Sequence, residues 1–263
     1  MYGGRVSATR TPELPPFVRL VGDPVRWRLL QALAGSDLRV RELVDSLDQP
    51  QNLVSYHLAK LRAARLVTAR RSSFSGRDTY YHLDLGRWAE EWADVGAALH
   101  PGLRSDVVPP LPDRTCGSVL FLCTGNSGRS PMAEALLRHR GAGAVEVASA
   151  GSHPRPLRPN AVRVMAEYGI ELEHQPTHVD ALRHRRFDWV ISLCDKVREV
   201  CPELPGHPTM VHWSLPDPEA TGATDAVTLP AYRRTAAELE RRIGYLLPRI
   251  TGSAPARVIR RDR

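Results

Sequence analysis

The apolar residues of the chain follow two different patterns, one in each half. In the first half they recur at helical spacing, in stripes separated by turn residues such as Gly22-Asp23-Pro24. Such stripes predict helices, and two short apolar runs around a polar turn predict a hairpin. The expected elements are two helices within 14–35, helices at 40–47 and 51–64, and strands at 66–71 and 79–83. This order indicates a mostly α-helical winged helix-turn-helix domain.

The second half alternates short apolar strands with helices. The strands are expected at 119–122, 144–148, 189–193 and 210–213, and the helices at 131–138, 159–168, 195–199 and 229–247. A strand that is apolar throughout is buried on both faces of its sheet. The alternation therefore indicates an α/β domain with a doubly wound parallel sheet.

A proline-rich stretch separates the two patterns. Residues 100–115 contain four prolines and predict a semi-rigid linker. The expected division is a first domain at 1–100, a linker at 101–116, a second domain at 117–250 and a basic tail at 251–263. A chain of 263 residues is long enough for each domain to have its own core.

Composition narrows the class of protein. The chain has no run of 18 apolar residues, and its first residues lack the apolar core of a signal peptide. All four cysteines lie in the second half, which fits reactive thiols in a reducing compartment better than a disulfide framework. We therefore expect a cytoplasmic protein with no membrane partner. The net charge of +7 is modest and is weak evidence for a nucleic-acid partner.

The most informative segment joins the first strand of the second half to its helix. It reads Cys123-Thr-Gly-Asn-Ser-Gly-Arg129-Ser130, and the backbone N–H groups of such a turn and helix start can bind a tetrahedral oxyanion. Arg129 can hold that oxyanion with two hydrogen bonds, and its charge favours the nucleophilic thiolate of Cys123. Ser130 can donate to the sulfur. The oxyanion contacts are expected from Thr124, Gly125, Asn126, Ser127, Gly128 and Arg129. The alternative is a buried structural cysteine beside a surface arginine.

This loop resembles the phosphate loop of the low-molecular-weight protein tyrosine phosphatase superfamily, especially its thioredoxin-coupled arsenate reductase branch. The resemblance covers roughly residues 117–250. It implies that Cys123 attacks arsenate, or a phosphate-like oxyanion, held in the loop. Arsenate reductases of this branch usually carry a further cysteine, outside their electron relay, where Gly128 stands.

Two more cysteines, Cys194 and Cys201, follow the strand at 189–193. Seven positions apart on a helix, they would be separated by roughly 10 Å of rise, whereas a disulfide needs Cα atoms within about 7 Å. The bridge can form only if this segment unwinds. Two buried, unreactive cysteines are the alternative. The resemblance implies that Cys194 resolves the intermediate, that Cys201 completes a disulfide, and that thioredoxin is the reductant.

A candidate general acid lies between two prolines. Asp217 stands in a segment that resembles the general-acid loop of the same family, and a carboxylic acid near the oxyanion can protonate a departing oxygen. An acidic surface turn is the alternative. Asn126, Glu134 and Ser149 match positions around the family's loop, some of which help bind potassium in certain members. Because a further acidic ligand is missing near Thr177, we expect no metal and no cofactor.

Charge is distributed unevenly in the first half. From Gln51 to Arg77 there are six basic residues and no acidic one, as expected for a surface that contacts phosphates. Phosphate contacts are expected from Lys60, Arg70, Arg71 and Arg77. Base contacts are expected from the first turns of the helix at 51–64, from Gln51, Asn52, Ser55, Tyr56 and His57. A solvated polar face is the alternative.

The segments Gly22-Asp-Pro-Val-Arg-Trp-Arg-Leu-Leu and Val54-Ser-Tyr-His-Leu resemble the ArsR family of metalloid-responsive repressors, over about residues 14–95. The resemblance implies a homodimer, joined through its first and last helices, on a double-stranded DNA operator. Trp88 and Trp92 suit that interface or an intramolecular core equally well. Arsenic-binding members often carry Cys-Val-Cys where this chain has Arg39-Val40-Arg41, so the usual arsenite site is missing.

The sequence thus predicts an ArsR-type regulator fused to an arsenate reductase. Two alternatives stay open: a tyrosine phosphatase fused to a regulator, which needs only Cys123, Arg129 and Asp217, and a pure regulator whose second domain binds an oxyanion without turnover. The first 115 residues contain no cysteine, and arsenite binds proteins chiefly through thiolates. We therefore expect arsenite capture, or oxidation of the Cys194–Cys201 pair, to lower operator affinity.

Overall fold

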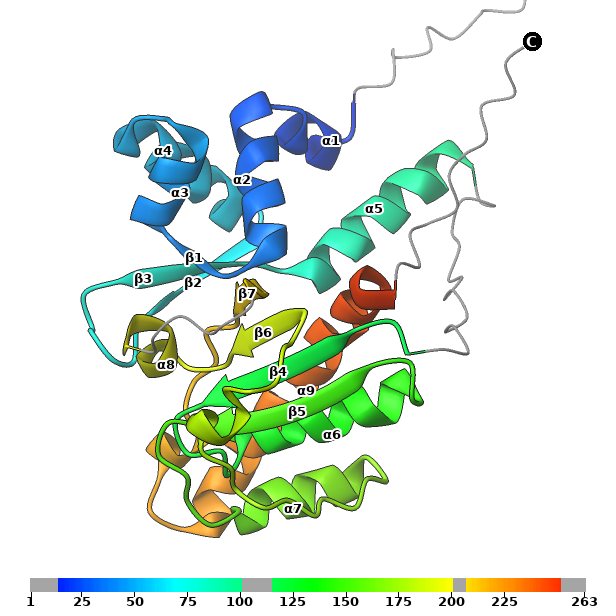
Figure 1. Cartoon of the computed structure of the whole chain (residues 1–263). Coiled ribbons are helices and arrows are strands. Elements are labelled where there is room, and N and C mark those ends of the chain that lie inside the picture. Colours follow the sequence, from blue (N-terminus) through cyan, green and yellow to red (C-terminus); the bar gives the residue numbers. More distant parts are fainter. Residues whose placement is uncertain (1–13, 101–114, 201–206, 252–263) are drawn as a thin grey trace, which may run out of the picture.

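Two β-sheets organise the chain, one in each half (Figure 1). The structure is a computed structural model that describes residues 14–100, 115–200 and 207–251. Within these ranges the first sheet is antiparallel with the order β1-β3-β2, and the second is parallel with the order β5-β4-β6-β7. The expected linker and basic tail fall largely on residues 101–114 and 252–263, outside the described ranges. None of the described helices is both long and apolar enough to cross a bilayer.

The N-terminal domain packs its helices on one side of the small sheet. Its elements are α1 (Pro16–Val21), α2 (Pro24–Gly35), β1 (Leu38–Arg39), α3 (Val40–Leu47), α4 (Gln51–Ala63), β2 (Val67–Arg71), β3 (Thr79–Leu83) and α5 (Leu85–Leu99). Asp23 caps α2 by accepting hydrogen bonds from the N–H groups of Val25 and Arg26. The shared core includes Leu29, Leu43, Val54, Leu58 and Leu61. This arrangement confirms the expected winged helix-turn-helix, and we call the turn 72–78 between β2 and β3 the wing.

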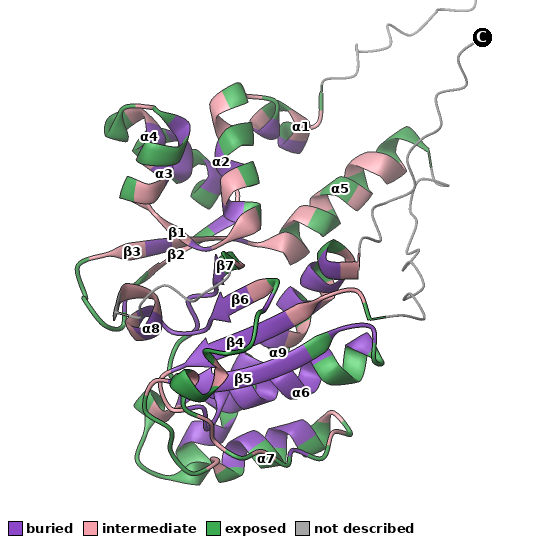
Figure 2. Cartoon of the chain, in the orientation of Figure 1, coloured by how far each residue is buried: buried purple, intermediate pink, exposed green. Residues whose placement is uncertain are grey.

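The C-terminal domain is built around β4. Its elements are β4 (Ser118–Cys123), α6 (Arg129–Gly141), β5 (Glu146–Gly151), α7 (Pro159–Glu167), the 3₁₀ helix η2 (Val179–Leu182), β6 (Trp189–Ser192), α8 (Asp195–Val200), β7 (Thr209–His212), the 3₁₀ helix η3 (Pro218–Thr221) and α9 (Asp225–Thr251). β4 pairs with β5 on one side and β6 on the other, and Val119 to Cys123 are all buried (Figure 2). The strand order reverses at β4, so its carboxyl end is a topological switch point, where doubly wound sheets bind ligands.

Some element boundaries differ from the sequence-based expectation. The strand expected at 144–148 is β5, which runs on to Gly151 because it stays paired with β4 up to Cys123. The final helix extends past both expected ends, from Asp225 to Thr251. Pairing and packing partners, rather than the local apolar pattern, set these ends.

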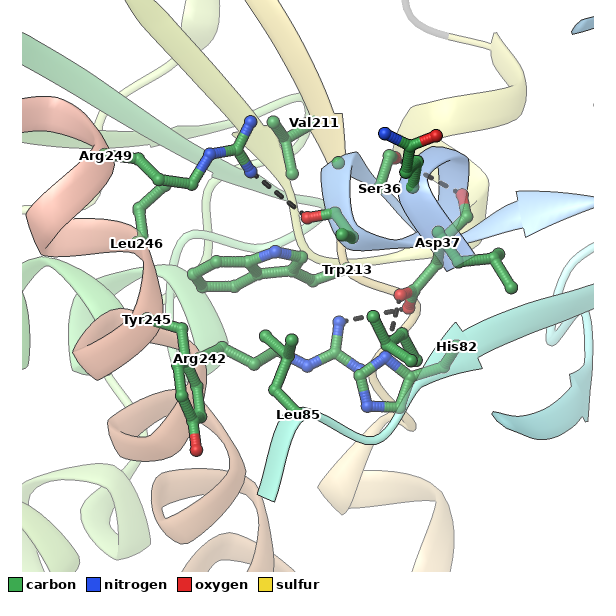
Figure 3. A pocket seen from close by; sticks show the side chains of 15 residues that line it. Ser36, Asp37, His82, Leu85, Val211, Trp213, Arg242, Tyr245, Leu246 and Arg249 are labelled. Atoms are coloured by element: carbon green, nitrogen blue, oxygen red, sulfur yellow. Dashed lines mark hydrogen bonds and ion pairs between the residues drawn. The ribbon is translucent and has the colours of Figure 1, made fainter. Parts of the chain in front are cut away.

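The two domains pack directly against each other. Arg242 of α9 is buried and forms an ion pair with Asp37 of the N-terminal domain at 3.0 Å (Figure 3). Asp37 also contacts His82 of β3 at 3.0 Å and accepts a hydrogen bond from the N–H of Ser214 at 2.8 Å. Burial opposes the charge of Asp37, but Arg242 and His82 outweigh burial, so the pKa of Asp37 is lowered. This carboxylate therefore ties the N-terminal domain to α9.

Candidate active site

Cys123 ends β4 at the switch point, in the turn before α6. Its sulfur lies 3.0 Å from Ser130 Oγ and accepts a hydrogen bond from the Asn126 N–H at 3.3 Å. Ser130 Oγ itself accepts from the side-chain amide of Asn126 at 3.0 Å, which leaves the hydroxyl hydrogen of Ser130 available to the sulfur. Both donors favour negative charge on the sulfur.

Asn126 fixes the shape of the loop. Its φ of 45° is left-handed, a conformation that asparagine adopts more readily than most residues. Its amide nitrogen also donates to Ser149 Oγ at 2.8 Å, and its oxygen accepts from the N–H of Thr177 at 2.7 Å and contacts His174 Nε2 at 2.9 Å. The Asn126 side chain is thus used inside the protein, and only its backbone can serve the oxyanion. His174 belongs to no motif in the sequence, so this contact was not predicted.

Gly151, at the end of β5, is a second supporting residue, and no sequence motif predicted it. A Cβ atom at this position would lie 2.7 Å from Thr124 O and 2.8 Å from Asn126 N, which is closer than atoms can approach. Only glycine therefore lets the loop pass against β5. Its signal in the sequence is merely a glycine after a buried strand.

Arg129 opens α6 and is buried. Its Nη1 donates to Leu215 O at 3.0 Å, and its Nη2 lies 3.3 Å from Asp217 Oδ2. Burial opposes the charge of Arg129, but the nearby acidic groups, Asp217 first and then Cys194 and Cys123, outweigh burial and raise its pKa. The expected general acid and the expected oxyanion ligand are therefore side by side.

Cys194 follows β6 and lies beside the same loop, with its sulfur 3.3 Å from Thr124 Oγ1. Because β6 neighbours β4, both cysteines come to one edge of the sheet. Burial raises the pKa of Cys194, and Arg129 offsets this effect only in part. Cys201 lies outside the described residues.

Both cysteines line one cavity of about 360 Å³. Its cations are Arg129, Arg155, Arg158 and Lys196. Arg155 and Arg158 are held in place by backbone hydrogen bonds to the carbonyls of Gly125 and Ser127, at 2.9 and 2.8 Å. Apart from Arg129, these cations follow no motif, so the sequence alone does not predict them. Such a cavity is suited to a small anion.

In the described part of the chain, no group of three or more His, Cys, Asp or Glu side chains is placed to hold a metal ion.

Most residues expected to contact DNA are exposed. These are Gln51, Asn52, Ser55, Tyr56 and Lys60 on α4, and Arg71 and Arg77 at the hairpin.

Two of the expected DNA contacts, from His57 and Arg70, need correction. His57 is buried, with Nδ1 3.8 Å from Asp23 Oδ1, because it shares the inner face of α4 with Val54. Arg70 is turned towards the C-terminal domain and pairs with Asp195 at 2.9 Å, since alternation along β2 sends Arg71 to the other face.

Comparisons with known proteins match each half separately. The family model described as low molecular weight phosphotyrosine protein phosphatase matches residues 118–256, and the one described as bacterial regulatory protein, arsR family, matches residues 23–69. An arsenate reductase from Shouchella clausii is 38% identical over 128 residues, which are 48% of this chain and 91% of that protein. One from Brevibacillus brevis is 42% identical over 102 residues, 38% of this chain and 76% of that protein. The solved arsenate reductase from Archaeoglobus fulgidus aligns at 30% identity with a TM-score of 0.42, covering 49% of this chain and 98% of that one.

Proposed function

Since the chain belongs to the low molecular weight phosphotyrosine protein phosphatase family, with an ArsR-family segment at residues 23–69, we propose that it is an arsenate reductase fused to a DNA-binding regulator. The observation that carries the reductase proposal is the second thiol, because Cys194 shares the cationic cavity with Cys123. Hydrolysis of a phosphate ester needs one thiol, whereas reduction takes its two electrons from a pair. The similarity to the arsenate reductases from Shouchella clausii and Brevibacillus brevis supports the same choice.

The first step forms a sulfur–arsenic bond. Arsenate binds to the backbone N–H groups of the loop and to the guanidinium of Arg129. The Cys123 thiolate attacks arsenic, one arsenic–oxygen bond breaks, and the oxygen leaves as water after Asp217 donates a proton. Asp217 Oδ2 lies 3.3 Å from Arg129 Nη2, so the carboxyl group is next to the site of the anion and, once protonated, can donate its proton there.

The second step transfers electrons from the thiols to arsenic. The Cys194 thiolate attacks the Cys123 sulfur, the sulfur–arsenic bond breaks, and its electron pair leaves with arsenic as arsenite. Cys201 then attacks the Cys194 sulfur, which frees Cys123 as a thiolate, and thioredoxin reduces the resulting disulfide. Such a relay needs reduced thiols at rest, so we place the protein in the cytoplasm.

A phosphatase is the second candidate. It is favoured by the contact between Arg129 and Asp217 beside Cys123, because these three residues are all that ester hydrolysis requires.

Arsenate reduction is tested by following NADPH consumption with thioredoxin and thioredoxin reductase. Hydrolysis of an aryl phosphate is measured on the same preparation. Continuous arsenate turnover supports the reductase. Hydrolysis of the aryl phosphate without turnover of arsenate would show that the protein is a phosphatase. Binding of the oxyanion without either reaction would show that the second domain is an oxyanion sensor.

For the regulatory half, we propose a homodimer that binds operator DNA through α4 and the wing. The support is the exposed polar face of α4 and the surface of α5, a 15-residue helix without a buried residue. Trp92 is 56% exposed on α5 and stacks on Trp88, while Phe17 of α1 packs against both rings. A partner's α1 and α5 would cover these aromatics. Sedimentation of the intact chain tests this, and a monomer at micromolar concentration would contradict it.

A further inference from the structure

The wing of the N-terminal domain reaches the active site of the C-terminal domain. Ser73 and Phe74 line the same cavity as Cys123, although they precede it by about 50 positions and belong to another domain. Phe74 is 49% exposed, so its ring is not part of a core. Figure 1 shows the β2–β3 hairpin extending over the C-terminal domain as far as α8. The aromatic ring therefore borders the space that a substrate of Cys123 would occupy.

Hydrogen bonds hold the wing in this position. Asp195, the first residue of α8, is fully buried and accepts from Arg70 Nη2 at 2.9 and 3.0 Å and from the N–H of Ser73 at 2.8 Å. The hydroxyl of Ser72 donates to Glu199 Oε1 at 2.6 Å. A buried carboxylate needs all such partners, so the wing does not leave Asp195 without cost.

A second ion pair, between Arg242 and Asp37, also joins the two domains. Figure 3 shows Arg242 and Asp37 paired next to the ring of Trp213. Ser214 joins this pair to the first attachment, because its N–H donates to Asp37 at 2.8 Å and its hydroxyl donates to Asp195 at 2.6 Å. Both partners of this pair are buried. With two attachments on different elements, the place of Phe74 over the cavity is fixed by the whole junction.

We propose that Phe74 and the wing determine which substrates reach Cys123, by admitting free inorganic oxyanions and excluding phosphoryl groups carried on a protein. The inference rests on the proposed function and refines its substrate class. A cavity of about 360 Å³ has the volume of a small-molecule site. A phosphorylated side chain on a folded protein must bring its own backbone close to the cavity, where Ser73 and Phe74 of the wing already lie. Arsenate or phosphate needs only the space beneath the ring.

The test measures access to Cys123 without depending on turnover. The intact chain is alkylated with iodoacetamide, which is small, and with a bulky maleimide, and the modified Cys123 peptide is quantified by mass spectrometry. Phe74→Ala should accelerate the bulky reagent about tenfold, as expected when a fixed ring that narrows access to the sulfur is removed, while changing the iodoacetamide rate less than about twofold. Phe74→Trp should slow the bulky reagent. Thr68→Ala, an exposed position on β2 away from the cavity, is the matched control and should match the wild type.

Kinetics on the same variants complete the test. For Phe74→Ala, kcat/KM for a phosphotyrosyl peptide should rise relative to that for p-nitrophenyl phosphate, with KM for arsenate unchanged. Equal alkylation ratios in wild type, Phe74→Ala and Phe74→Trp would overturn the proposal. A loss of peptide hydrolysis in Phe74→Ala would also overturn it, because the ring would then bind aryl substrates rather than exclude them. If arsenate is not turned over at all, the proposed function fails, yet the alkylation ratios still decide on the wing.

Discussion

In the proposed mechanism, the sulfur of Cys123 is activated by groups that are fixed before substrate arrives. Ser130 and the N–H of Asn126 contact the sulfur, and Arg129 adds a buried positive charge in the same cavity. Donors that need no rearrangement stabilise developing charge more than mobile donors do. The loop therefore prepares both the nucleophile and the anion site.

Cys123→Ser should abolish arsenate reduction and any phosphatase activity, because a serine hydroxyl in this loop stays protonated near neutral pH. Both activities are measured on the same preparation, and Cys116→Ser serves as the control because Cys116 does not line the cavity. Far-ultraviolet circular dichroism confirms that each variant is folded. Substantial turnover by Cys123→Ser would remove Cys123 from the mechanism.

Site residues could be predicted from the sequence where they lie close together along the chain. Cys123, Arg129 and Ser130 belong to one short segment, so their spacing alone indicates their chemistry. Gly151 and Arg155 come from a distant part of the chain and act through backbone contacts with the loop that no local pattern encodes. For His57 the residue type suggested base contacts, but the direction of its side chain depends on the packing of α4.

At the scale of elements, α8 is held at several points by the N-terminal domain. Asp195 pairs with Arg70 at its start, and Arg198 pairs with Glu42 of α3 at 3.0 Å. The sequence predicts the helix and the need for it to unwind before Cys194 and Cys201 can meet. It does not predict these contacts, because they join residues more than 120 positions apart. Unwinding of α8 must therefore loosen the wing as well.

Cys194→Ser and Cys201→Ser should each stop continuous arsenate reduction while sparing hydrolysis of an aryl phosphate, because only reduction takes electrons from the protein's thiols. Steady-state NADPH consumption and p-nitrophenol release measure the two reactions separately. If both variants still cycle with thioredoxin, the relay is wrong and the phosphatase assignment gains. Adding glutathione shows whether a small thiol replaces one step.

The helix α4 and the hairpin should make different contributions to DNA binding. Replacing Arg71 and Arg77 by Ala should weaken binding to every sequence and reduce the slope of log K against log salt by about one for each phosphate that is no longer neutralised. Ser55→Ala should instead change the preference for one DNA sequence over another, since this side chain is exposed on α4. Fluorescence anisotropy across a salt series makes the measurement, and binding that is independent of salt would contradict the assignment.

His57→Ala should lower the melting temperature of the protein, because the ring is buried.

At the scale of the whole molecule, two buried carboxylates join the domains. The pKa of Asp195 is lowered because hydrogen bonds from His212, Ser214 and Ser73 and the charge of Arg70 outweigh burial, and that of Asp37 is lowered in the same way by Arg242. A carboxyl whose folded pKa is depressed stabilises the fold fully above its unfolded pKa, and this contribution is lost as pH falls through the folded value. The junction should therefore be intact at pH 5 and weaken below the ordinary carboxyl value of 3.8. Small-angle scattering between pH 5 and pH 2 measures this, and domains that separate already above pH 5 would contradict it.

We expect Arg70 to couple the redox state of the proposed relay to the binding of DNA. In this structure its guanidinium is bound to Asp195, so it cannot neutralise a DNA phosphate at the same time. If α8 unwinds to form the Cys194–Cys201 disulfide, Arg70 is released from Asp195. Because β2 is the edge strand of its sheet, the long side chain of Arg70 can then extend past that edge to a further phosphate. Coupling between two sites is reciprocal, so operator binding should also favour the disulfide. The direction is opposite to the one expected from the sequence alone, which gave no sign that Arg70 is engaged within the chain.

We therefore expect the oxidised chain to bind operator DNA more tightly than the reduced chain, and the difference to disappear in Arg70→Ala. Each neutralised phosphate corresponds to about one unit in the slope of log K against log salt, so the oxidised form should also show the steeper slope. Anisotropy titrations with reduced and oxidised protein measure both quantities. A redox titration with and without operator measures the reciprocal effect, which should raise the fraction of disulfide at a given potential. Cys201→Ser, which cannot close the disulfide, should respond to neither change. Weaker binding by the oxidised chain would instead support release of the operator, and an unchanged difference in Arg70→Ala would show that the coupling takes another route.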